Sequence, residues 1–76
     1  METYKLGSSP MIGAPGIVRW AINGYKTARM GERARLVKLI TEGWPGVTER
    51  AANALLSEAV PYTVTKDGAV KFAVSR

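Results

Sequence analysis

Apolar residues recur at spacings of three and four in the stretch that follows Pro15, which is the period of an amphipathic helix. These residues are Ile17, Trp20, Ala21, Tyr25 and Ala28. Proline suits the first turn of a helix, because a backbone N–H at that position has no intrahelical partner to lose. The pattern predicts a helix that begins near Ile17 and breaks at Gly31.

A second stretch with the same period covers about 32–42 and predicts a second helix. Its expected buried positions are Leu36, Val37, Leu39 and Ile40. Gly43 follows directly and is expected to be the left-handed residue that ends the helix. Trp44 lies in the tight connection after it and is expected to fill part of the core.

Thr48 predicts the start of a third helix, because its hydroxyl can accept a hydrogen bond from a free backbone N–H of the first turn. Glu49 is favourable beside the positive end of the helix dipole. The expected buried stripe of this helix consists of Ala52, Leu55, Leu56 and Ala59. The predicted helix therefore extends from Thr48 to Ala59.

The last segment alternates apolar and polar residues and predicts a β-hairpin. A three-residue loop over 66–68, with Gly68 in the left-handed region, pairs Tyr62 with Phe72 and Val64 with Val70. This register places the apolar side chains on one face of the hairpin, whereas a shift by one residue would place apolar and polar side chains on the same face. The expected apolar face consists of Val60, Tyr62, Val64, Val70, Phe72 and Val74.

The N-terminal segment, residues 1–16, is predicted to be flexible. Residues 7–16 are rich in Gly, Ser and Pro, and the alternation in residues 1–6 is only a weak indication of a strand. With 76 residues in all, the chain is expected to form a single small domain over 17–76. The predicted class is α+β, with three helices followed by a C-terminal β-hairpin.

The composition excludes most catalytic chemistry. The chain has no Cys and no His, so it lacks the usual zinc ligands, the usual thiol nucleophile and the commonest general base. Its few carboxylates have no spacing that would bring two of them into one cleft, and no nucleotide-binding motif is present. We expect a protein that is not an enzyme and that uses no metal and no cofactor. No apolar run is long enough to span a membrane, so no membrane partner is expected.

The positive charge is concentrated in one window. The formal net charge is +5, and residues 19–38 account for all of it, with Glu32 as the only acid against six basic residues. Those six are Arg19, Lys26, Arg29, Arg33, Arg35 and Lys38. A concentrated positive field attracts phosphate backbones or acidic protein surfaces, and arginine suits bidentate phosphate contacts. A helix face that is simply solvated by Lys and Arg would give the same count.

The order of helix, helix, turn, helix and hairpin over 17–76 resembles that of winged helix-turn-helix domains. The resemblance implies that the helix after the turn enters the major groove of DNA, where Arg50 and Asn53 would contact base edges. It also implies that the hairpin contacts DNA through Lys66 and Lys71. The predicted third helix carries Glu49 and Glu58 in addition to Arg50, so the phosphate contacts would fall to the two helices before it.

Together these features predict a small cytoplasmic DNA-binding protein with an accessory role or a role in transcription regulation, of the kind found in phages and plasmids. A chain this short offers little contact area, so specific recognition would require a homodimer or a larger complex. The alternatives are an interaction module or inhibitor that docks on an acidic protein, and an RNA-binding protein. The candidate nucleic-acid-binding residues are Arg19, Lys26, Arg29, Arg33, Arg35, Lys38, Arg50, Asn53, Lys66 and Lys71.

Overall fold

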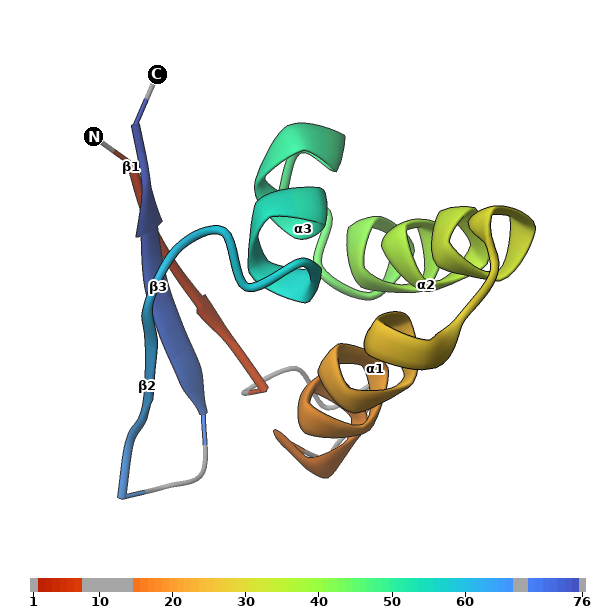
Figure 1. Cartoon of the computed structure of the whole chain (residues 1–76). Helices are drawn as coiled ribbons and strands as arrows, with labels where there is room; N and C mark the ends of the chain where they lie inside the picture. The colour runs from red at the N-terminus through yellow and green to blue at the C-terminus, as the bar shows by residue number, and fades with distance from the viewer. Residues whose placement is uncertain (1, 8–14, 67–68, 76) are drawn as a thin grey trace.

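A three-stranded antiparallel sheet forms one side of the protein and three helices form the other (Figure 1). The computed structural model describes residues 2–7, 15–66 and 69–75. In chain order the elements are β1 (Glu2–Leu6), α1 (Pro15–Thr27), α2 (Met30–Gly43), α3 (Glu49–Leu56), β2 (Tyr62–Val64) and β3 (Val70–Val74). No helix in these ranges has the length and apolar character needed to cross a bilayer.

β3 is the central strand, with β1 on one side and β2 on the other. On the β2 side Tyr62 pairs with Phe72 and Val64 with Val70, so the predicted hairpin register is confirmed. The backbone N–H of Thr65 closes the hairpin by donating to the carbonyl of Ala69 at 2.8 Å. The left-handed conformation expected at Gly68 concerns a position outside the described residues.

The predicted arrangement of three helices followed by a C-terminal hairpin, similar to a winged helix, is wrong. The sheet has a third strand, β1, which precedes all the helices and pairs antiparallel with β3. Leu6 is only 1% exposed, and the Tyr4 ring stacks on Phe72 at a centroid distance of 5.3 Å. Five residues of alternation are a weak signal by themselves, but the free side of β3 supplies a partner that the local pattern cannot reveal. Residues 8–14 of the expected flexible segment lie outside the described residues.

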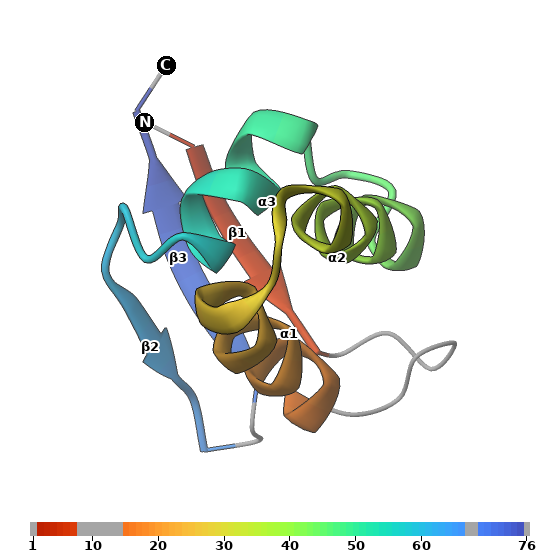
Figure 2. The ribbon, with the colours of Figure 1, turned by 45° about the vertical axis from the view of Figure 1, so that its right-hand side comes forward.

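The helices form two layers above the sheet. α1 and α3 lie between the sheet and α2, which is on the far side of the molecule from the strands (Figures 1 and 2). α2 packs against α1 and α3. Because α1 and α3 separate α2 from the sheet (Figure 1), much of the α2 surface faces solvent. Most of the basic window lies on α2 or just before it.

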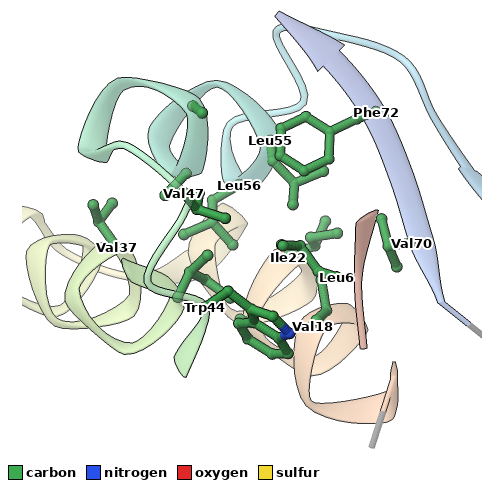
Figure 3. Packing of buried hydrophobic residues seen from close by; sticks show 14 residues of the cluster. Leu6, Val18, Ile22, Val37, Trp44, Val47, Leu55, Leu56, Val70 and Phe72 are labelled. Carbon is green, nitrogen blue, oxygen red and sulfur yellow. The ribbon is translucent and has the colours of Figure 1, made fainter. Parts of the chain in front are cut away.

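The core lies where the sheet, the three helices and the loop after α2 converge (Figure 3). Its largest fully buried side chains are Leu6, Ile22, Ile40, Leu55, Leu56, Val18 and Val70. Trp44 is 7% exposed, so its predicted core position is confirmed. Its indole lies among core side chains from the helices and the sheet, near Val18 and Leu6 (Figure 3).

The buried stripe of α1 differs from the predicted one. Val18, Ala21 and Ile22 are buried, whereas Trp20 is 61% exposed. Both stripes have helical spacing and share Ala21, so the sequence alone does not determine which side of Ala21 faces the core. The sheet and α3 together select the side that carries Val18 and Ile22.

The two helix ends also differ from the predictions. Gly43 is a helical residue at the end of α2, and the left-handed residues in the described part of the chain are Gly7 and Glu58. Glu58 has a φ of 56° and ends α3, with its N–H donating to the carbonyl of Leu55 at 3.0 Å. The next N–H, that of Ala59, reaches back to the carbonyl of Ala54, which completes a Schellman turn. Ala59 therefore lies beyond the helix and is exposed.

Candidate nucleic-acid interface

A groove of about 900 Å³ lies between α2 and α3, beside the C-terminal end of α1. Four of the ten residues predicted from the sequence line it, namely Arg33, Lys38, Arg50 and Asn53. They come from two helices that are separated in sequence by the Trp44 turn. The tertiary structure thus brings part of the basic window together with the polar face of α3.

Helix periodicity explains why these side chains share one groove. On α2 the residues spaced by three and four from Met30, including Ala34, Lys38 and Thr41, lie on one face. On α3 the residues Arg50 and Asn53 are exposed, because the opposite face is buried in the core. Thr48 starts α3 as predicted, since its hydroxyl accepts a hydrogen bond from the N–H of Ala51 at 3.1 Å.

Tyr25, near the end of α1, connects the two walls of the groove. Its hydroxyl donates to Oδ1 of Asn53 at 2.6 Å, and its carbonyl accepts a hydrogen bond from Nε of Arg33 at 3.1 Å. The Arg33 guanidinium carbon also lies 4.9 Å from the centre of the Tyr25 ring, which is a cation–π distance. These contacts restrain the Arg33 and Asn53 side chains, which are otherwise exposed.

The sequence pattern places Tyr25 on a buried stripe and does not identify it as part of the site. Tyr25 is in fact half-buried, with its ring against the core and its hydroxyl at the groove. Its partner Asn53 is 28 positions away in sequence. A contact of this separation depends on how α1 and α3 pack, and no local spacing indicates it.

Two of the predicted cations have acidic neighbours. Nζ of Lys26 lies 2.7 Å from Oε1 of Glu58, and this hydrogen bond and charge attraction raise the pKa of Lys26 above its ordinary value. Lys38 is 3.8 Å from Glu42 on the next turn of α2, where both side chains are well exposed and the pair is weak. Lys26 therefore has Glu58 as a close partner, whereas Lys38, with a longer and more exposed contact, is the more accessible of the two to a ligand.

Four of the candidate arginines, three in the basic window and Arg50 on α3, form no ion pair with an acidic residue in the part of the chain that the structure describes. The three in the basic window are Arg29, Arg33 and Arg35. Arg33 and Arg50 line the groove, but Arg29 and Arg35 do not. Arg29 immediately precedes α2, and its side chain makes no capping hydrogen bond.

The remaining candidates lie elsewhere. Arg19 is exposed on α1 and does not line the groove. Lys71 alternates with the buried Val70 and Phe72, so it points from the sheet away from the helices. There it is opposite Thr63 on β2 and Lys5 on β1. Lys66 is exposed beside the hairpin turn, and the groove does not include it.

The groove has a net positive lining. Arg33, Lys38 and Arg50 contribute three positive charges, and Glu49 is the acidic residue that lines the same groove. Arginine and lysine donate hydrogen bonds and accept none, so the groove is suited to ligands that carry negative oxygens. Among the described residues, no group of three or more acidic side chains is arranged to hold a metal ion.

Comparisons with known protein families, with curated proteins and with solved structures found no match for this chain.

Proposed function

We propose that this protein binds duplex DNA through its phosphate backbone, as a small accessory or regulatory protein without catalytic activity. The observation that carries the proposal is the convergence of Arg33, Lys38 and Arg50 in one open groove. These cations come from α2 and α3, and Tyr25 restrains Arg33 in place. The helices that form the groove are held in place by the core, and the groove is positively charged. These two properties favour binding of a rigid polyanion such as duplex DNA.

The number of cations in the groove also predicts how strongly DNA binding depends on salt concentration. Each phosphate that a protein neutralises on duplex DNA contributes about 0.9 to the slope of log affinity against log salt. Contacts by the three groove cations would give a slope of about −2.7. Replacing Arg33 and Arg50 would leave Lys38 and a slope of about −0.9.

The experiment is a fluorescence anisotropy titration of a labelled 20-bp duplex at several salt concentrations. The test variant is Arg33→Ala with Arg50→Ala, and the matched control is Arg19→Ala with Arg35→Ala. Both variants lose two positive charges, but only the first pair lies in the groove. We expect the groove variant to bind up to about 30-fold more weakly at low salt, from about 1 kcal/mol for each exposed charge pair.

The control variant should keep the slope of the parent protein. Equal losses in both variants would mean that total charge, and not the groove, determines binding. A parent protein that does not bind the duplex at low salt would refute the proposal. Circular dichroism of both variants would check that they are folded. This check is needed because Arg33 also contacts Tyr25.

A protein with an acidic surface is the second candidate ligand. Met30 lines the groove and is 87% exposed, and flexible methionine side chains are common at protein-binding surfaces. A competition experiment separates the two ligands. Displacement of the duplex by poly-L-glutamate at an equal or lower concentration of charge would favour the acidic protein.

A further inference from the structure

The Asn53 amide is oriented by its contact with Tyr25. The Tyr25 hydroxyl donates to Oδ1 of Asn53 at 2.6 Å, so the carbonyl end of the amide faces the end of α1. The amide nitrogen is on the other branch of the planar group and points away from Tyr25. Asn53 therefore keeps both N–H donors for a ligand, while one of the two acceptor positions of its oxygen is occupied by Tyr25.

This orientation bears on which part of DNA Asn53 can contact. An asparagine reads adenine with two hydrogen bonds, in which its oxygen accepts from the base amino group and its nitrogen donates to the ring. Both ends of the amide must then face the base edge. With Tyr25 already donating to the oxygen, a base edge would compete with Tyr25 for it, whereas a phosphate needs only the donor end.

The neighbouring cations are also donors. Arg33 uses its Nε on the Tyr25 carbonyl and retains its terminal nitrogens, and Arg50 and Lys38 accept no hydrogen bonds. Thr41, which also lines the groove, donates its hydroxyl proton to the Lys38 carbonyl at 3.0 Å, so its oxygen faces a ligand as an acceptor, as does the Glu49 carboxylate. The donors of the three cations and of Asn53 outnumber these two acceptors. A ligand made of acceptors, such as a phosphodiester, therefore matches the set better than a base edge that mixes donors and acceptors.

We infer that the groove contacts phosphate oxygens and does not read bases, and that Tyr25 is the positioning residue that holds Asn53 as a donor. The inference rests on the proposed function and specifies which part of the DNA the groove recognises. It differs from the winged-helix expectation, in which Arg50 and Asn53 of α3 read base edges. Its consequence is that binding through the groove does not depend on base sequence.

The test compares two 20-bp duplexes, one of A·T pairs only and one of G·C pairs only, by anisotropy at fixed salt. The quantity of interest is the ratio of the two affinities, measured for the parent and for Asn53→Ala. The minor groove of the DNA differs in width between the two duplexes, so the ratio measured for the parent protein need not be one. We expect Asn53→Ala to weaken binding to both duplexes by the same factor, about two- to fivefold, and to leave the ratio unchanged within twofold.

The variant Tyr25→Phe tests the positioning role. It removes the hydroxyl that holds the Asn53 amide, so we expect binding to both duplexes to weaken by about the same factor as in Asn53→Ala, with the ratio unchanged within twofold. The double variant Tyr25→Phe with Asn53→Ala should bind no more weakly than Asn53→Ala alone, since the effect of Tyr25 is transmitted through Asn53. Circular dichroism establishes that each variant is folded.

The outcomes distinguish this inference from the proposed function. If Asn53→Ala changes the ratio by more than twofold, Asn53 reads bases and the inference is wrong, while DNA binding stands. If Tyr25→Phe binds both duplexes as tightly as the parent, Tyr25 does not hold Asn53 as a donor and its positioning role is refuted. If neither duplex binds at low salt, the proposed function fails, and the inference fails with it.

Discussion

Leu6→Ala tests whether β1 is an integral part of the fold. Leu6 is 1% exposed, lies at the end of β1 and pairs with Val70 on the central strand. Were the N-terminal segment flexible, as its composition suggests, truncation of this side chain would have almost no effect on stability. Because the side chain belongs to the core cluster, we expect a large effect.

The expected magnitude follows from the burial. A fully buried leucine that is truncated to alanine costs about 2–5 kcal/mol, which combines the lost burial with the cavity that remains. Leu6 is the last residue of its strand, where neighbouring groups can relax, so a value of about 3 kcal/mol is expected. A domain of this size has a total stability of about 4–11 kcal/mol. The substitution would therefore remove a large part of that stability and lower Tm by about 12–24 °C.

The assay is urea denaturation followed by tryptophan fluorescence. Trp44 is 7% exposed and should report unfolding, whereas Trp20 is 61% exposed and would add a background signal. The measurement is best made in a Trp20→Phe protein, so that the fluorescence comes from Trp44. Leu6→Val is the milder companion, with an expected loss of about 1 kcal/mol, and it keeps the test valid if Leu6→Ala does not fold.

Thr3→Val is the control on the same strand. Thr3 is exposed, and the substitution keeps its shape, so the stability should stay within about 0.5 kcal/mol of the parent. A Leu6→Ala protein within about 0.5 kcal/mol of the parent would refute the role assigned to β1 in the core.

Two further predictions concern the ends of α3. Thr48→Ala should lower stability by about 1 kcal/mol, because it removes the acceptor for the Ala51 N–H, and Thr48→Ser should restore most of it; equal urea midpoints for all three proteins would contradict this. The raised pKa of Lys26 means that its ion pair with Glu58 stabilises the fold fully below pH 10.5 and is lost as pH rises through the raised value. Thermal melts of the parent and of Glu58→Gln should therefore converge at high pH, and a constant difference in Tm across the alkaline range would show that the pair does not act in this way.

Much of the secondary structure could be predicted from the sequence because its signals are local. Helical spacing, the Thr48 cap and the alternation around the hairpin all act within a few residues, and the structure has the three helices, that cap and the hairpin register. The core position of Trp44 was also predictable, since a large apolar side chain in a tight turn between helices has few other places to go. The absence of Cys and His is likewise a property of the sequence itself.

The features that only the tertiary structure decided depend on contacts between residues far apart in the chain. β1 is a strand because β3, more than sixty positions later, offers it an unpaired side, and five alternating residues cannot signal that. The face of α1 that is buried was decided in the same way, which leaves Trp20 in solvent and brings Val18 into the core. The basic window was evident in the sequence, but which of its cations line the groove was not. Packing of α2 against α3 placed Arg33 and Lys38 beside Arg50, and packing of α1 against α3 placed the Tyr25 hydroxyl on Asn53.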